Sequence, residues 1–187
     1  MSMPAPLYGG GYTVDDLEHI DLPGRFELIH GDIVMMPPAK SWHNEVQFLL
    51  RSVLTPVARE HGFRAVHEQG AILAEDTDPV PDLMIIDGAA YDHALHSYPA
   101  EAVAVVVEIE SGNKRKDRIE RPADYARAGI PWYWRIENVD DVPVIRAFRL
   151  DCGLYEPVGV YGKGDRLDLT EPFEIAFDIA DIADITP

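Results

Sequence analysis

The sequence VVEIESGNKRKDRIERPADYARAGIPWYW, residues 106–134, begins as an apolar strand and ends as an aromatic one. The run that leads into it, residues 102–107, is apolar at every position, which predicts a strand covered on both faces. Glu108 and Glu110 follow, although an unpaired buried carboxylate costs several kcal/mol. A basic run then places five cations within eight positions: Lys114, Arg115, Lys116, Arg118 and Arg121. The carboxylates of the strand therefore need a partner, and cations follow them closely in sequence.

Glu108 and Glu110 are expected on the same face of the strand, with Cβ atoms about 7 Å apart. Two like charges at that spacing need a cation beside them, either an arginine or lysine or a metal ion. Mg²⁺ would take one or two carboxylates, with water and phosphate oxygens completing its shell. The structural alternative is a salt bridge from either glutamate to Arg118 or Arg121 on the following helix. Residue chemistry alone leaves both interpretations open.

The composition limits the class of protein. The chain has 187 residues, 47% of them apolar, which predicts one domain over residues 1–187 with a flexible end at 1–11. Its formal net charge of −17 repels nucleic acid on average, although residues 114–121 form a local basic strip. No apolar run of membrane-spanning length and no signal-peptide pattern occurs, so we expect a cytoplasmic protein without a membrane partner. The one cysteine, Cys152, excludes an internal disulfide framework and a CxxC metal site.

The pattern along the chain predicts a mixed α/β fold, a sheet flanked by helices. Helices are expected at 13–20, at 41–62 with Pro56 kinking or shortening it, and at 117–128 with Ile119, Ala123 and Ala126 facing inward. A hairpin is expected around Gly31-Asp32. Further strands are expected at 63–69, 71–75, 80–87, 102–110, 131–137, 144–150 and 154–161. The C-terminal tail IAFDIADI, 175–182, is expected to be exposed and is the candidate interface of a dimer.

Several short motifs together resemble the Uma2 family of bacterial proteins. They are FELIHGD in the hairpin, Pro81-Asp82 at the head of a strand, VVEIxS with its glutamate 26 positions later, the basic DRIER helix and YARAGIPWYW. The most specific of them is DYARAGIPWYW, and the resemblance covers residues 12–134, and more loosely the rest. It implies the PD-(D/E)XK nuclease fold, a restriction-endonuclease-like mixed central sheet flanked by helices.

The resemblance also implies a site for Mg²⁺ or Mn²⁺. Asp82 and Glu108 would be the metal-binding carboxylates, with the carbonyl of Ile109 as a further ligand. Glu27 would help to hold the metal or its water. Glu110 could add another ligand, which would make a second metal ion easier to bind.

Two positions depart from the family's pattern. Glu110 stands where many nucleases of this fold carry a lysine. The family draws its lysine from the following helix instead, and at that position this chain has Arg121. An arginine can donate two hydrogen bonds to a phosphate, but its pKa above about 12 excludes a role as proton acceptor. Arg121 could therefore stabilise charge, while water activation would fall to the metal, aided by Glu110 or Glu27.

Other conspicuous residues are expected to be structural. His43 matches a position where the family often has histidine, but its expected role is that of a surface residue at a helix N-terminus. His93 and His96 are expected in a surface loop. The aromatic residues 132–134 are expected to pack in the core and at the sheet edge.

The expected function is that of a Mg²⁺-dependent endonuclease that hydrolyses DNA phosphodiester bonds as a homodimer. One alternative is an inactive nuclease-fold protein with a binding or regulatory role, whose carboxylates pair with Arg118 and Arg121. The other is a hydrolase of small nucleotides or phosphoesters, which an acidic surface tolerates better than it tolerates a duplex.

Overall fold

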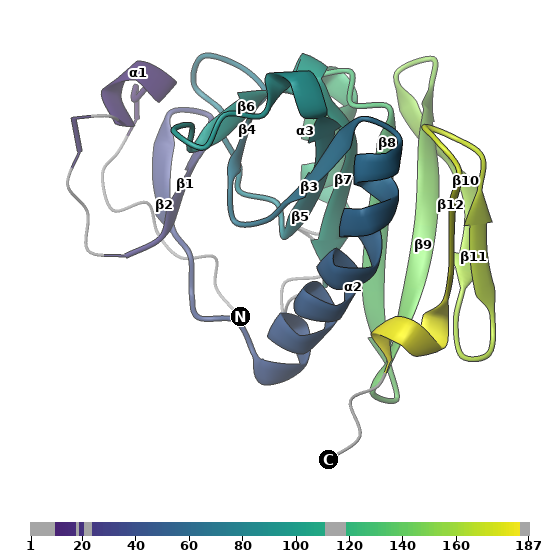
Figure 1. Ribbon diagram of the computed structural model, residues 1–187. Coiled ribbons are helices and arrows are strands. Elements are labelled where there is room, and N and C mark those ends of the chain that lie inside the picture. The colour runs from purple at the N-terminus through teal and green to yellow at the C-terminus, as the bar shows by residue number, and fades with distance from the viewer. Residues whose placement is uncertain (1–9, 18, 21–23, 111–118, 184–187) are drawn as a thin grey trace.

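The computed structural model describes residues 10–17, 19–20, 24–110 and 119–183 (Figure 1). A six-stranded sheet forms its centre, in the spatial order β10, β9, β8, β7, β5, β3. The strands are β3 (Phe63–Val66), β5 (Leu83–Asp87), β7 (Val103–Ile109), β8 (Trp132–Val139), β9 (Val142–Asp151) and β10 (Leu154–Tyr161). Strands β7 and β8 are parallel, and the other neighbours are antiparallel. The sheet is mixed, as predicted.

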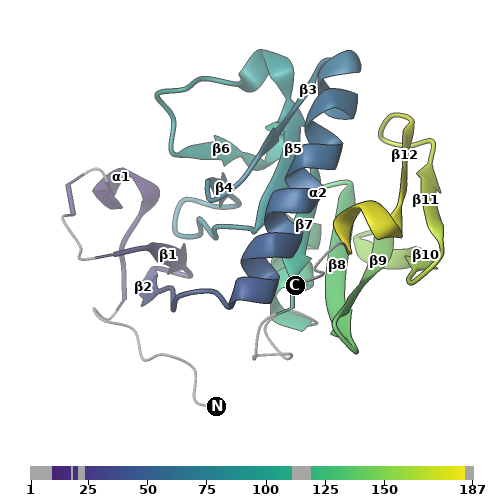
Figure 2. The same cartoon turned by 60° about the horizontal axis from the view of Figure 1, so that its bottom comes forward.

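Strand β7 is covered on both faces, as its continuous apolar run predicted. On one face Val105 and Val107 pack in a core with residues of helix α2 (Ser41–Glu60). On the other face Val106 packs in a second core with Tyr125 of helix α3 (Arg121–Arg127). Figure 2 shows α2 lying along the sheet. Glu108, the carboxylate that follows this apolar run, is therefore buried as well.

The predicted hairpin around Gly31-Asp32 is present. Strands β1 (Phe26–Ile29) and β2 (Asp32–Met35) pair antiparallel. His30 and Gly31 form the turn with positive φ angles of 51° and 80°, the conformation that a two-residue hairpin turn requires. A single antiparallel bridge between Leu28 and Asp78 attaches the hairpin to the segment that leads into β5.

The remaining elements are short. Helix α1 (Val14–Leu17) begins after Thr13, whose backbone N donates to the Asp16 carboxylate at 2.8 Å, a hydrogen bond typical of a helix N-terminus. Strands β4 (Gly70–Ile72) and β6 (Ser97–Pro99) form a parallel pair outside the main sheet. The other elements are η1 (Gly88–Ala90), η2 (Ala100–Ala102), β11 (Arg166–Leu169), β12 (Ile175–Asp178) and η4 (Ile179–Ile182).

The prediction that Pro56 shortens its helix is wrong, because α2 continues through Pro56 to Glu60, and the kink stays a prediction. The proline forfeits one backbone hydrogen bond. Its ring lies on the exposed side, while Leu54 and Ala58 on either side of it pack in the core. Core packing therefore outweighs the local cost. None of the helices in the described residues is both long and apolar enough to cross a membrane.

The predicted inward face of the third helix is also wrong. Ile119 is 64% exposed and Ala123 is exposed, whereas Arg121 and Tyr125 are buried. The reason is electrostatic: Arg121 and Tyr125 both point at buried carboxylates, described below. Residues 117 and 118, which were expected to begin this helix, lie outside the described residues, as do Lys114, Arg115 and Lys116.

The C-terminal tail is not an exposed apolar surface, so the prediction that it is exposed is wrong, and its role as a dimer interface stays untested. Ile175, Phe177, Ile179 and Ile182 are all buried in the core that contains α2. The alternation of β12 turns Ile175 and Phe177 inward and leaves Ala176 exposed. Figure 2 shows η4 beside α2, against which it packs.

Candidate functional site

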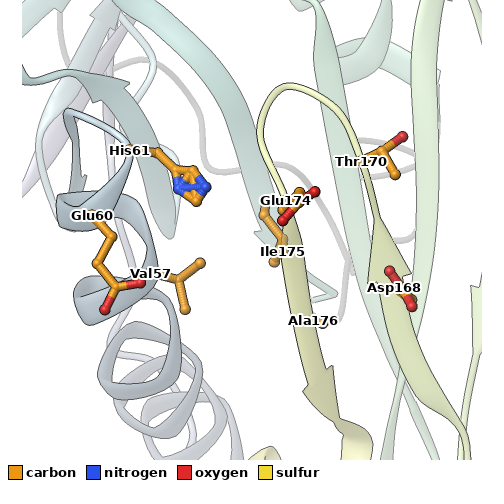
Figure 3. Close-up of a pocket in the computed structure, with 8 residues that line it drawn as sticks. All are labelled: Val57, Glu60, His61, Asp168, Thr170, Glu174, Ile175 and Ala176. Atoms are coloured by element: carbon orange, nitrogen blue, oxygen red, sulfur yellow. The ribbon is translucent and has the colours of Figure 1, made fainter.

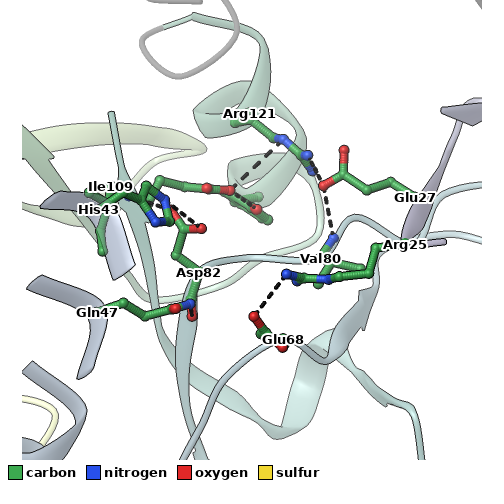
Figure 4. Close-up of polar contacts among 11 residues, drawn as sticks. Arg25, Glu27, His43, Gln47, Glu68, Val80, Asp82, Ile109 and Arg121 are labelled. Atoms are coloured by element: carbon green, nitrogen blue, oxygen red, sulfur yellow. Dashed lines mark hydrogen bonds and ion pairs between the residues drawn. The ribbon is translucent and has the colours of Figure 1, made fainter. Parts of the chain in front are cut away.

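Two predicted carboxylates meet at one end of the sheet. Leu83 of β5 pairs with Val107 of β7, so Asp82 and Glu108 are the next residues in register. Asp82 Oδ2 accepts a hydrogen bond of 2.6 Å from the backbone N of Ile109 (Figure 4). The structure thus brings together three of the residues that the sequence singled out as metal ligands.

The first turns of α2 hold Asp82 from the other side. His43 Nε2 lies 3.0 Å from Asp82 Oδ1, and Gln47 Nε2 donates to the Asp82 backbone carbonyl at 2.6 Å. The His43 side chain is only 15% exposed, so its expected place on the surface is wrong. Burial lowers the pKa of His43, but the hydrogen bond to Asp82 and the charges of Asp82 and Glu108 outweigh burial and raise it above 6.5. His43 is therefore a donor that helps to fix the carboxylate.

Glu108 turns toward α3. Its Oε1 accepts a hydrogen bond of 2.5 Å from the Tyr125 hydroxyl and lies 3.9 Å from Arg121 Nε. Burial raises the pKa of Glu108 to about 8, against the attraction of Arg121, and the negative charges of Asp82 and Glu27 add to the rise. The nearby cation Arg121 therefore does not offset the burial of Glu108.

Arg121 joins the hairpin to the site. It forms an ion pair with Glu27 of β1, and both side chains are buried. Glu27 also accepts a hydrogen bond of 3.2 Å from the backbone N of Val80. Burial lowers the pKa of Arg121, but the charges of Glu27, Tyr125 and Glu108 raise it further above its ordinary value. Arg121 is therefore a permanent cation between two buried carboxylates, and its Nη1 has no hydrogen-bond partner among the described residues.

Glu110 lies in a different group of charges. Its carboxylate is 3.6 Å from Nε of Arg135 on β8, which also pairs with Glu137. The predicted salt bridge is present for Glu108, which lies beside Arg121, whereas Glu110 contacts Arg135; the metal ion stays a prediction. No contact among the described residues joins Glu110 to Asp82, so its role as a metal ligand stays a prediction.

The donor set at the sheet end suits a hard divalent cation only in part. Within the described residues, no group of three His, Cys, Asp or Glu side chains is arranged to hold a metal ion. Asp82 and Glu108 supply two carboxylates, and Ile109 supplies a backbone carbonyl. Mg²⁺ needs few protein ligands, because water and phosphate oxygens complete its octahedral shell. The residues therefore fit Mg²⁺ as an ion shared with a phosphate substrate, rather than as one enclosed by protein.

Sequence reasoning missed three residues of this site. Tyr125 lies four positions after Arg121, and Gln47 four positions after His43, so each pair shares a helix face, which was a usable signal. Asp78 gave no such signal. It is buried and accepts a hydrogen bond of 2.6 Å from the Ser97 hydroxyl. Burial raises its pKa to about 6, against that hydrogen bond, and the charge of Glu27 raises it further.

A cavity of about 460 Å³ lies elsewhere, between the C-terminal end of α2 and the β11–β12 pair (Figure 3). Glu60, Asp168 and Glu174 line it, and none of the described residues around it is lysine or arginine. Its acidic lining would repel a phosphate group. His43 and Gln47 belong to the opposite end of the same helix, so the cavity is separate from the site at Asp82.

Comparisons with known proteins identify the family and the fold. Residues 14–182 match the family model of Uma2, described as "Putative restriction endonuclease". The chain belongs to the Uma2 family. Its fold is similar to that of "a putative nuclease belonging to DUF820" from Anabaena variabilis ATCC 29413, with a TM-score of 0.70 and 20% identity over 92% of this chain and 97% of that one. No curated protein matches the chain.

These matches confirm the predicted family and the restriction-endonuclease-like fold. At 20% identity, the similarity to the solved structure carries the fold alone. The candidate site of this Uma2 protein therefore rests on its own residues, above all on the pairing of Asp82 with Glu108 and on Arg121.

Proposed function

We propose that this protein is a nuclease that hydrolyses DNA phosphodiester bonds with the help of Mg²⁺ or Mn²⁺. The observation that carries the proposal is the meeting of Asp82 and Glu108 at the ends of adjacent strands. Burial and the neighbouring carboxylates raise the pKa of Glu108 to about 8, because the attraction of Arg121 does not offset them. Strongly shifted carboxylates at one end of a sheet are typical of functional sites. Membership of the Uma2 family supports the same reaction class.

Each residue has a distinct role in the proposal. Asp82, Glu108 and the carbonyl of Ile109 would hold the ion, and when bound it would polarise the phosphodiester and the attacking water. Arg121 balances the negative charge around the reacting phosphate, and Glu27 anchors that arginine. Glu110 contacts Arg135 instead, which favours one metal ion over two. The reaction is the hydrolysis of one P–O ester bond by one water molecule.

The substrate and assembly are further parts of the proposal. A net charge of −17 means that DNA must be held by local positive charge rather than by the average field. Residues 114–121 carry the densest run of cations in the sequence. Cutting both strands of a duplex needs two sites, so the proposed active form is a homodimer. The large apolar side chains of the tail 175–182 are buried within one chain, so they do not supply its interface.

A specific observation favours a second candidate function, that of a binding protein on a nuclease fold. Arg121 already supplies a cation to Glu27 and lies 3.9 Å from Glu108. In that case the carboxylates would be structural, and the domain would recognise a partner without cutting it. The two candidates differ in one measurable property, the binding of a divalent ion.

The test is calorimetric titration of Mg²⁺ and Mn²⁺ into the wild type and into Asp82→Ala and Glu108→Ala. Asp168→Ala is the matched control, because Asp168 is exposed on β11, away from the site. We expect binding by the wild type and the control, loss of binding in both site variants, and plasmid nicking that needs the bound ion. If the wild type binds neither ion, the nuclease proposal is wrong and the binding protein is the better description.

A further inference from the structure

We propose that Tyr125 is a positioning residue that fixes the Glu108 carboxylate and leaves one of its two oxygens for the metal ion. This inference rests on the proposed function and concerns the same site. Its basis is the hydrogen bond of 2.5 Å from the Tyr125 hydroxyl to Glu108 Oε1. Arg121 Nε approaches that same oxygen, at 3.9 Å. No hydrogen bond from a described residue reaches the other oxygen, Oε2.

The hydroxyl is held in place by its surroundings. Tyr125 is fully buried, and its ring contacts that of Tyr133 at a centroid distance of 6.2 Å. Tyr133 in turn contacts Phe148 at 5.7 Å and Tyr155 at 5.5 Å. The ring therefore cannot swing away without disrupting a packed aromatic group. A donor on so rigid a support sets the rotation of the carboxylate that it contacts.

Helix α3 explains why a tyrosine is needed beside the arginine. Arg121 and Tyr125 lie one helical turn apart on the buried face, and they contact Glu27 and Glu108 respectively. Without the tyrosine, Glu108 could rotate toward Arg121 and form a two-pronged pair, which is the preferred geometry of arginine with a carboxylate. Both oxygens would then be occupied. The hydroxyl accordingly keeps Glu108 in a state in which Oε2 stays available to an ion.

A residue that orients a metal ligand has a measurable effect on metal affinity. Removing the partner that orients a ligand costs about 10-fold to 100-fold in metal affinity. Tyr125→Phe removes the hydroxyl and keeps the ring, so the packing against Tyr133 should survive. Tyr155→Phe is the matched control: its hydroxyl donates to the Ile130 carbonyl at 2.8 Å in the same aromatic group and does not contact Glu108.

The experiment is a titration of Mn²⁺ into the full-length wild type, Tyr125→Phe and Tyr155→Phe, with thermal unfolding of each protein without metal. We expect Tyr125→Phe to bind Mn²⁺ at least about 10-fold more weakly than the wild type, and Tyr155→Phe to bind it as the wild type does. Equal affinity in all three proteins would overturn the role of Tyr125 and leave the proposed function intact. A wild type that binds no Mn²⁺ would overturn both proposals. An equal loss of affinity in the two variants would also overturn the role of Tyr125, because the effect would then belong to the aromatic group as a whole.

Discussion

Two groups of charged residues, one around Glu108 and one around Glu110, differ in their charge balance. Among the described residues, the acid-rich cluster consists of Glu27, Asp78, Asp82, Glu108 and Arg121, in which Arg121 contacts Glu27 and Glu108, while Asp82 contacts His43 and Asp78 contacts Ser97. The balanced cluster consists of Glu110, Arg135, Glu137 and Arg146, with two cations for two carboxylates. Glu137 accepts hydrogen bonds from Arg146 at 2.7 Å and from Arg135 at 3.0 Å.

The two clusters shift their carboxyl groups in opposite directions. Burial would raise the pKa of Glu137, but the hydrogen bonds from Arg146 and Arg135 outweigh it and lower the pKa. Burial raises the pKa of Glu108 and of Asp78, and in neither case do the nearby donors outweigh it. A carboxylate that is buried near an arginine is therefore not by itself a candidate site. The ratio of cations to carboxylates separates a completed structural ion pair from a site that can accept a further cation.

The largest expected effect comes from removing the shared arginine. Arg121→Ala should lower the free energy of unfolding by about 3–5 kcal/mol, because it removes the buried cation that pairs with Glu27 and lies beside Glu108. Urea unfolding at pH 7 measures this loss. Arg121→Lys is the control, since it keeps a positive charge and should lose less. A loss below about 1 kcal/mol in Arg121→Ala, as for an exposed ion pair, would contradict the idea that Arg121 balances the acid-rich cluster.

A smaller change in the free energy of unfolding is expected when one carboxylate in each cluster is neutralised. Its sign should differ between the two clusters. Asp78 has a pKa of about 6 in the folded protein, above its ordinary 3.8. The folded state therefore holds the proton more tightly, and the free energy of unfolding falls as the pH rises from about 4 to about 6. Asp78→Asn removes this penalty. At pH 8 it should be more stable than the wild type by up to about 3 kcal/mol, and near pH 4 the gain should vanish.

Glu137→Gln is the counterpart in the balanced cluster. The pKa of Glu137 is lowered on folding, so its stabilising contribution is present above its ordinary value of 4.5 and is lost as the pH falls. Glu137→Gln should therefore be less stable than the wild type at pH 8. Urea unfolding from pH 4 to pH 8 compares the two variants. Changes of the same sign in both would remove the distinction between the clusters.

The smallest effect is expected from Arg146→Ala, which should lower the free energy of unfolding by about 1 kcal/mol or less. The Arg146 side chain is 38% exposed, and Arg135 continues to donate to Glu137 after the substitution. Thermal unfolding at low and high salt should show a small difference that salt reduces further. A loss of stability as large as that of Arg121→Ala would mean that the balanced cluster depends on both arginines and that Arg135 cannot replace Arg146.

Much of the fold was predictable because its signals are local. The continuous apolar run before Glu108 predicted a strand covered on both faces, and Gly31-Asp32 predicted a hairpin turn. The helical periodicity that begins at Ser41 predicted α2. Errors occurred where packing competes with local preference, as at Pro56, whose cost is outweighed by the buried residues around it.

The candidate site was predictable only in part. Asp82 and Glu108 were expected together, and the register of β5 with β7 places them so. Glu110 was expected beside Glu108, but it lies beyond the end of β7 and contacts Arg135 of β8. Periodicity in sequence gives the face of a strand, but it does not say which strand is its neighbour or which charge that neighbour carries.

The family, the mixed α/β class and the central strand with its buried carboxylate follow from the order of residues alone. Which cation each carboxylate contacts depends on the folded chain. Glu27 and Arg121 are 94 positions apart in the chain, yet they form a buried ion pair. The same contact turns Arg121 inward and leaves Ile119 at the surface. Turns and apolar periods depend on neighbours within a few residues, whereas the pairing of buried charges depends on contacts between distant segments, which only the folded chain brings together.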